Sequence, residues 1–277
     1  MWGVILASLG TLFDEISLSI GKFEVSSKRE STYTMAFLNL VFSTAIFVVL
    51  ALTTKAFSFS LASLPTFSLR VVLEIIQIYV TMLAIVTADR STFSFIRVLT
   101  IPLLLGMDGL LGYTFEPLQV VGLILIVAVI ALLSLNHGLG QAGRWLVGFT
   151  AVNAVLTISL YKYDITHFNS VVGEQLTLQL ILMVCLFLAA RFWTNQNPLI
   201  LLRQSIFFTQ SAAQGIGSVV ESFAYSFAPA SIVLAAKRSS AVLWSIVSGS
   251  QYFHERHVVL KLTALGLLTV GIVLLII

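Results

Sequence analysis

Residues 118–136 read LQVVGLILIVAVIALLSLN, a run without a charged side chain. A helix of about twenty apolar residues crosses the roughly 30 Å hydrocarbon core of a bilayer. Similar runs recur along the chain, and they lack the alternation of apolar and polar residues typical of membrane β-strands. Because every backbone N–H and C=O needs an internal partner in lipid, these runs predict a bundle of transmembrane helices.

The composition of the whole chain has the same character. Of its residues 58% are hydrophobic and only 10% are charged, and the mean hydropathy is +1.02, whereas soluble domains carry about a quarter charged residues. The net charge is +3, but the basic residues are scattered between apolar runs, which argues against nucleic-acid binding. We therefore expect a multi-pass protein of the cell membrane, inner or plasma, with the lipid bilayer as its surroundings.

We predict an all-α fold with ten transmembrane helices and no soluble domain. Short polar connections separate the spans, which are placed at 2–21, 34–53, 69–88, 92–111, 118–136, 145–163, 171–192, 205–226, 230–250 and 259–277. Weak internal matches divide the chain into repeats at residues 1–140 and 141–277; for example, ISL at 16–18 recurs at 158–160. Because five is an odd number of spans, the second repeat would be inverted relative to the first, as in many secondary transporters.

Lysines close the first and sixth spans, and each half ends on a similar tail. These features are Lys22 and Lys162, residues 101–106 (IPLLLG) leading to 116–122 (EPLQVVG), and residues 229–231 (PAS) leading to Glu255. With the five-plus-five plan, they resemble the drug/metabolite transporter superfamily, of the ten-helix EamA-like type. The resemblance implies a cavity among spans three, four, eight and nine, peripheral spans five and ten, and cytoplasmic termini. Lysine and arginine counts in the connections favour termini outside instead, so both orientations stay open.

Two motifs suggest chemistry that their context does not support. Residues 138–143 (GLGQAG) match the dinucleotide-binding glycine pattern, but they join two predicted spans and not a strand and a helix. Residues 254–257 (HERH) lack the i, i+4 histidine spacing of zinc-protease helices. We expect loops at both places, and we expect no enzyme activity, no metal and no cofactor.

Polar side chains within the spans are the candidate site residues, because a charge inside the bilayer is costly and normally faces the bundle interior or a water-filled path. Spans three and eight each carry a polar stripe with four, three, four spacing, which places its members on one helical face. The stripes are Arg70, Glu74, Gln77 and Thr81 on span three, and Gln210, Gln214, Gly217 and Glu221 on span eight.

Spans four and nine add further polar residues. Arg97 and Asp108 lie about three turns apart on span four, with Pro102 between them, where it can kink the helix. Span nine carries the candidate residues Lys237, Arg238 and Trp244. Arg238 occupies nearly the same position in the second repeat as Arg97 in the first.

These residues predict a secondary transporter that moves a small polar metabolite, an amino acid or a similar charged solute, by alternating access. Glu74 and Glu221 would bind a cationic or zwitterionic group or carry a coupling proton. The basic side chains would bind a carboxylate or phosphate of the solute, or would neutralise the two glutamates in one conformational state. These basic residues are Arg97, Lys237 and Arg238. The alternative is a non-transporting membrane scaffold whose polar stripes only bond helix to helix.

Overall fold

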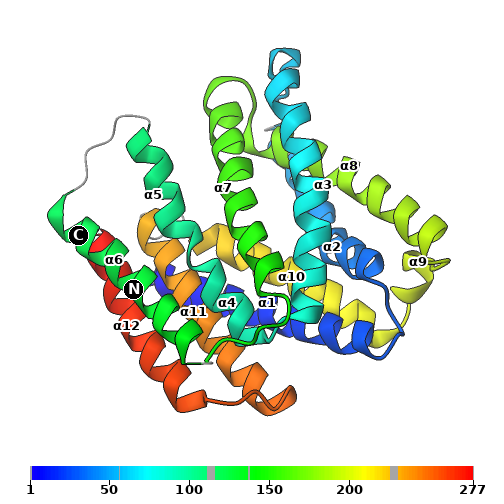
Figure 1. The fold of residues 1–277 in the computed structure, drawn as a ribbon. Helices are drawn as coiled ribbons and strands as arrows, with labels where there is room; N and C mark the ends of the chain where they lie inside the picture. Colours follow the sequence, from blue (N-terminus) through cyan, green and yellow to red (C-terminus); the bar gives the residue numbers. More distant parts are fainter. Residues whose placement is uncertain (1, 56, 111–115, 137, 225–229, 277) are drawn as a thin grey trace. The chain divides into compact units, whose positions relative to one another are not determined.

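The computed structural model describes residues 2–55, 57–110, 116–136, 138–224 and 230–276, and over these residues the regular structure is helical, without a strand. The elements in chain order are α1 (Trp2–Ser26), α2 (Thr32–Thr54), the 3-10 turn η1 (Leu61–Ser63), α3 (Leu64–Thr87), α4 (Arg90–Arg97), α5 (Thr100–Leu110), α6 (Pro117–Leu135), α7 (Arg144–His167), α8 (Val171–Trp193), α9 (Pro198–Leu201), α10 (Ser205–Ala224), α11 (Ala230–Tyr252) and α12 (Val258–Ile276) (Figure 1).

Within the described residues, six helical stretches are long and apolar enough to cross a membrane: α1, α2, Leu61–Thr87, α6, α7 and α8. The chain is therefore an all-helical, multi-pass membrane protein. Within the described residues, each span expected from hydropathy overlaps at least one helix. The number of ten crossings and the inverted repeat stay predictions.

The fourth expected span differs from the prediction of one helix over 92–111. It is divided into α4 and α5, with a turn at Val98 and Leu99. Pro102 explains the break, because it has no N–H for the carbonyl four residues earlier and its ring clashes with that carbonyl. The carbonyl concerned, on Val98, instead accepts a hydrogen bond of 3.0 Å from Ile101 N.

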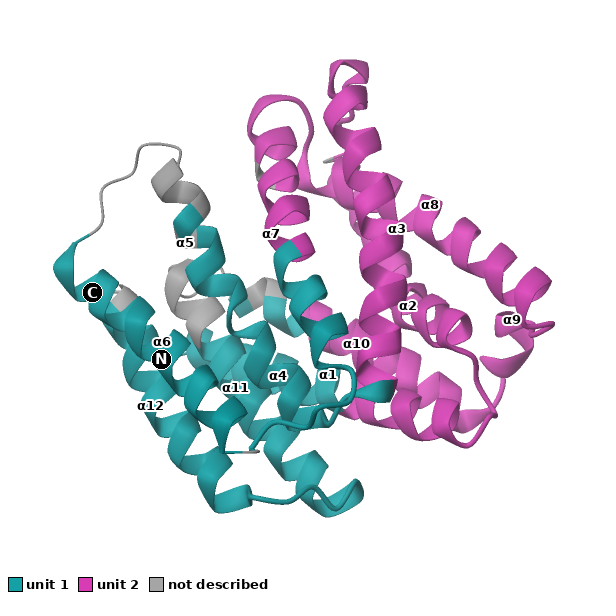
Figure 2. Ribbon diagram, in the orientation of Figure 1, with its two compact units in different colours: residues 1–15, 87–152, 220–277 teal, residues 16–86, 153–219 magenta. Residues whose placement is uncertain are grey.

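Two compact units make up the chain, and each is described by itself (Figure 2). Unit 1 comprises residues 1–15, 87–152 and 220–277, and unit 2 comprises residues 16–86 and 153–219. Each unit thus draws on both of the expected repeats. The repeats at 1–140 and 141–277 are defined by internal sequence similarity, whereas the two units are defined by contacts between residues. The division into repeats stays a prediction.

Unit 1 is held by close helix packing. α6 lies beside α12, and α11 packs against both α12 and α4 (Figure 1). At Gly271 on α12 a Cβ atom would come within 2.9 Å of Ile126 Cγ1 and 3.2 Å of Gly122 O on α6. Small residues let membrane helices approach this closely, and dispersion contacts then hold them together.

In unit 2, α2 packs along α8, and α10 lies against α2. Thr44 Oγ1 donates a 3.0 Å hydrogen bond to Gln179 Oε1 across the α2–α8 contact. A Cβ atom at Gly215 would come within 2.4 Å of Phe42 Cβ, so only glycine fits where α10 meets α2. Both buried polar side chains and apolar packing therefore hold these helices together.

Candidate functional site

A buried ion pair of unit 2 joins α3 to the first turn of α8. Arg70 Nη1 lies 2.6 Å from Glu174 Oε1, and both side chains are almost completely buried, at 4% and 0% exposure. The Arg70 guanidinium also lies over the ring of Tyr161, 4.5 Å from its centroid. The α8 N-terminus favours a negative charge, so the carboxylate is stabilised by the helix as well as by its partner.

Hydrogen bonds from the connections complete the surroundings of Glu174. Asn169 Nδ2 donates to Glu174 Oε2 at 2.5 Å and to Ser63 Oγ at 2.9 Å. Thr66 Oγ1 at the start of α3 donates to the carboxylate of Asp164 on α7. A Cβ atom at Gly173 would come within 2.2 Å of Ser58 O, so the segment before α3 lies directly against α8. This network joins α3, α7 and α8 at one end.

The rest of the span-three stripe contacts the same helices. Glu74 Oε1 lies 3.9 Å from Arg70 Nε, and Gln77 Oε1 accepts a 2.8 Å hydrogen bond from Asn153 Nδ2 on α7. Asn153 also donates to the Leu73 carbonyl at 3.0 Å. Much of this stripe therefore bonds helix to helix.

A second buried ion pair lies in unit 1 and joins α1 to α4. Arg90 Nε and Nη2 donate to Glu15 Oε1 and Oε2 at 2.9 and 2.6 Å, a two-pronged arrangement. Ser248 Oγ on α11 donates to Glu15 Oε1 at 2.5 Å. The Arg90 side chain is 0% exposed and that of Glu15 8%, so this site is sealed within unit 1.

The connection after α11 supplies a carboxylate to the N-terminus of α4. Glu255 Oε1 accepts a 2.5 Å hydrogen bond from Arg90 N, and Ser91 Oγ donates to Oε2. Lys261 Nζ on α12 lies 2.9 Å from Glu255 Oε2. A Cβ atom at Gly249 would come within 2.5 Å of Glu255 Cδ. The HERH segment is thus a loop, as expected, and its acid satisfies free backbone donors of a helix.

A further ion pair lies inside expected spans, and both of its side chains are partly accessible. Lys237 Nζ on α11 donates to Glu221 Oε1 and Oε2 on α10, both at 2.6 Å. The side chains are 27% and 14% exposed. Both are candidate site residues from the sequence, and the structure places them in contact within unit 1.

The remaining unit 1 candidates lie on α11, α4 and α5. Trp244 Nε1 on α11 donates to the Ser8 carbonyl of α1 at 3.0 Å, and Arg238 is partly buried on α11. Arg97 ends α4 at the helix break, with its guanidinium 5.5 Å from the Phe93 ring centroid. Asp108 falls on α5, and its side chain lies outside the described residues.

The unit 2 candidates on α10 include Gln210, Gln214 and the buried Gly217. Gln210 is fully buried, and its Nε2 donates to Glu30 Oε1 at 3.3 Å. Among the described residues, Glu30 Oε2 and Gln210 Oε1 have no hydrogen-bond partner. Glu30 lies in the connection between α1 and α2, and burial raises its pKa well above the ordinary value. The hydrogen bond from Gln210 lowers this pKa, and the negative charge of Glu24 raises it further.

Glu30 predicts a pH dependence of stability. Its raised pKa means that the folded protein binds more protons than the unfolded chain once the pH exceeds the ordinary value of 4.5. The free energy of unfolding should therefore fall as the pH rises from there towards the folded pKa, by at most about 1.4 kcal/mol per pH unit. Glu30→Gln should remove this slope in SDS titrations at pH 5 to 8. Glu116→Gln, which changes an exposed acid, should retain it, and an unchanged slope in Glu30→Gln would contradict the assignment.

Several charged residues of these networks were not selected as site candidates from the sequence. Arg90 and Glu255 fall in expected connections, and Glu174 lies at the edge of a span, where charges are common. The only signal for them was that each is a charge beside an apolar run. Arg90 lies 75 residues from Glu15 and 165 from Glu255, and Glu174 lies 104 residues from Arg70, so no local spacing could identify these contacts.

The GLGQAG segment at 138–143 lies in the connection between α6 and α7. Gly143 has φ +69°, and a Cβ atom there would come within 2.9 Å of Ala88 N. Gly140 N donates to Thr92 Oγ1 at 2.8 Å. Gly143 thus allows a turn with positive φ, and Gly140 lets the connection lie close to the start of α4.

Within the described part of the chain, no group of three or more His, Cys, Asp or Glu side chains is placed to hold a metal ion. In comparisons with known proteins, no protein-family model matches the chain, and no curated protein is significantly similar to it.

Proposed function

We propose that this protein is a secondary transporter of a small polar metabolite, with ten transmembrane helices in two inverted repeats and an alternating-access mechanism. The observation that carries the proposal is the Glu221–Lys237 pair. It joins two helices, α10 and α11, that correspond to the predicted spans eight and nine. An ionisable group inside a membrane span is a candidate for a substrate or proton path.

Accessibility distinguishes this pair from the three other ion pairs of the described residues that are 2.6 to 2.9 Å long. The side chains of Arg70, Glu174, Arg90, Glu15, Lys261 and Glu255 are each at most 8% exposed in their ion pairs. Lys237 is 27% exposed. A solute can reach a partly exposed pair without prior opening of a packed core, so the sealed pairs are better explained as structural and this one as a binding site.

A zwitterion fits the charges of the pair. Its ammonium group can bind Glu221 and its carboxylate can bind Lys237, so that each buried charge exchanges one opposite charge for another. Without solute, the two side chains neutralise each other at 2.6 Å. The bound and empty states are therefore both paired, and neither leaves an isolated charge in a low-dielectric region.

The broken helix α4–α5 supports the same proposal. Discontinuous helices recur at transporter sites, where they free backbone groups for ligands. α4 packs against α11, the helix that carries Lys237 and Arg238. Arg97 ends α4 at the break, and we assign it and Arg238 to anionic groups of the solute.

A non-transporting scaffold is the second candidate, and the span-three stripe favours it. Arg70 and Gln77 bond α3 to α8 and α7. Those contacts need no solute. Under this proposal Glu221 and Lys237 would also serve only to join α10 to α11.

Uptake by proteoliposomes tests the proposal. A panel of zwitterionic amino acids, primary amines and dicarboxylates should contain at least one transported class, with zwitterions transported best. Glu221→Gln and Lys237→Gln should each lower that uptake about 10- to 100-fold, because a hydrogen bond to a charged group contributes roughly 1.5–3 kcal/mol.

Arg256→Gln provides the matched control, because it removes an exposed charge in a connection, and it should transport at the wild-type rate. Helix content and monodispersity should be equal in all variants. Uptake by Glu221→Gln and Lys237→Gln at the wild-type rate would show that the pair is not the binding site. No uptake of any class by folded wild-type protein would favour the scaffold.

A further inference from the structure

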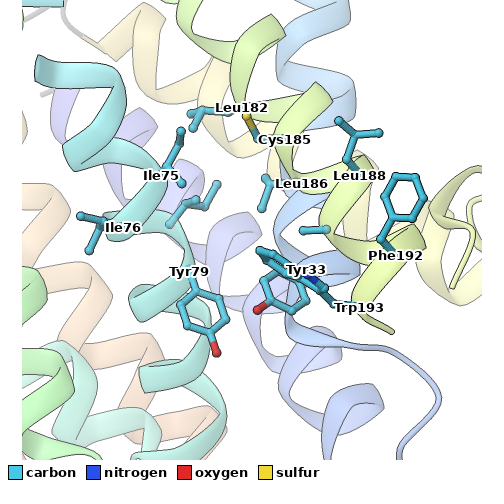
Figure 3. A pocket seen from close by; sticks show the side chains of 12 residues that line it. Tyr33, Ile75, Ile76, Tyr79, Leu182, Cys185, Leu186, Leu188, Phe192 and Trp193 are labelled. Atoms are coloured by element: carbon cyan, nitrogen blue, oxygen red, sulfur yellow. The ribbon is translucent and has the colours of Figure 1, made fainter. Parts of the chain in front are cut away.

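An apolar groove of about 780 Å³ lies in unit 2 between α3 and α8, with the start of α2 at one end (Figure 3). This volume is within the range of roughly 300–1,000 Å³ for small-ligand sites. Its walls are aliphatic along most of their length, with side chains such as Ile75, Leu182 and Leu186. The groove is distinct from the Glu221–Lys237 pair, which belongs to unit 1.

The polar groups of the groove gather at one end. Tyr33 and Tyr79 stack there with ring centroids 5.1 Å apart, and Trp193 lies 5.3 Å from Tyr33 (Figure 3). Tyrosine and tryptophan favour the boundary between hydrocarbon and headgroups. Since α2, α3 and α8 are all long and apolar enough to cross the membrane, the aliphatic part of the groove lies at the depth of the lipid chains.

The groove has the length of one leaflet. On α8 its lining runs from Leu182 to Trp193. Eleven residue steps in a helix cover about 16 Å, and half of the hydrocarbon core is roughly 15 Å. A single acyl chain that enters beside the aromatic end would therefore reach the aliphatic end.

The segments next to the aromatic end in sequence carry exposed basic residues. Ser31 N and Thr34 Oγ1 both donate to Gln196 Oε1 at 2.8 Å, which ties the connection before α2 to the segment after α8. α9, which follows that segment, packs against α2 and α8. These joined segments carry four exposed cations, here called the basic rim: Lys28, Arg29, Arg191 and Arg203.

The acids of the same region do not cancel the basic rim. Glu24 and Glu30 are buried, at 2% and 3% exposure. Glu24 lies 3.6 Å from Arg29, which leaves three rim cations without an ion-pair partner among the described residues. Exposed cations on segments at the membrane surface attract anionic lipid headgroups.

We propose that the groove between α3 and α8 binds an anionic phospholipid, with one acyl chain along the aliphatic walls and the phosphate on the basic rim. The apolar walls select a hydrocarbon chain, and the rim selects a negative headgroup. The site does not depend on transport activity.

The single cysteine, Cys185, lines the groove and reports its occupancy without any mutation. In detergent-purified full-length protein, its rate of modification by a hydrophobic maleimide should fall as phosphatidylglycerol is added. Only the lipid-free fraction reacts, so lipid at about ten times its Kd should slow the reaction about tenfold. Phosphatidylcholine should protect more weakly, and glycerol phosphate, which has no acyl chain, should not protect.

Variants separate the rim from the walls. Arg191→Gln combined with Arg203→Gln should reduce protection by phosphatidylglycerol to the level of phosphatidylcholine, whereas Arg256→Gln should leave it unchanged. Ala189→Phe, which adds a ring inside the groove, should abolish phospholipid adducts in native mass spectrometry. Val184→Phe, on an exposed face of α8 outside the groove, should retain them.

Three results would overturn the proposal. One is an absence of phosphatidylglycerol adducts together with a modification rate that the lipid does not change. Another is equal protection by the two phospholipids. The third is protection that follows protein concentration and not lipid, since a second copy of the chain would then cover the groove.

Discussion

Arg70→Met is expected to lower the free energy of unfolding by on the order of 3–5 kcal/mol, because it leaves Glu174 as a buried charge without its partner. Glu174 is 0% exposed, and only Asn169 among the described residues would still donate a side-chain hydrogen bond to it. SDS titration of the purified protein, followed by circular dichroism, measures the loss. Arg256→Met, at an exposed position, should change stability by less than about 0.5 kcal/mol.

The double variant Arg70→Met/Glu174→Leu is the decisive companion. Replacing a buried ion pair by apolar side chains of similar volume is often neutral or stabilising, so the second change should recover most of the loss. If the double variant is less stable than Arg70→Met, the cost does not come from an unpaired carboxylate. Equal stability of Arg70→Met and wild type would exclude the pair as a structural contact.

Arg90→Leu is expected to have an effect of similar size in unit 1, roughly 3–5 kcal/mol. The change removes both hydrogen bonds from the guanidinium to Glu15, while the hydrogen bond from Ser248 Oγ remains. Arg90→Lys should lose less, since lysine keeps the charge but not the two-pronged geometry. Ser248→Ala should lose roughly 1.5–3 kcal/mol, the contribution of one hydrogen bond to a charged group.

The order of these three variants is the test, measured as the midpoint of thermal aggregation in detergent. A midpoint for Arg90→Lys equal to that of wild type would show that charge alone, and not bidentate geometry, stabilises the contact. If Ser248→Ala lowers the midpoint more than Arg90→Leu does, the hydrogen bond from α11 stabilises this site more than the ion pair does.

Helix positions were the most predictable part of the fold. Apolar runs of about twenty residues have only one way to satisfy their backbone groups in lipid, so hydropathy places helices without knowledge of their neighbours. The break between α4 and α5 was only partly predictable. Pro102 marks a weak point in the sequence, but whether a helix bends or divides there depends on what the freed carbonyl of Val98 can bond to.

The site residues show the same limit. Polar residues in apolar runs identified Glu221 and Lys237 one by one, because each is costly in the bilayer. Their contact could not be read from the sequence, since the helix-to-helix connection sets which faces meet. The stripe containing Arg70 and Gln77 looked equally functional, yet those side chains bond α3 to neighbouring helices.

The apolar runs alone establish an all-helical, multi-pass membrane protein, and the polar residues within them identify side chains such as Glu221 and Lys237 that are too costly in lipid to lack a partner. Those properties depend on transfer free energies of single segments, and they are local. The tertiary structure decided the partners: Glu15 with Arg90, Glu174 with Arg70, Glu255 with the start of α4, and Glu221 with Lys237. Partner choice depends on distances between helices, and hydrophobic periodicity contains no information about them.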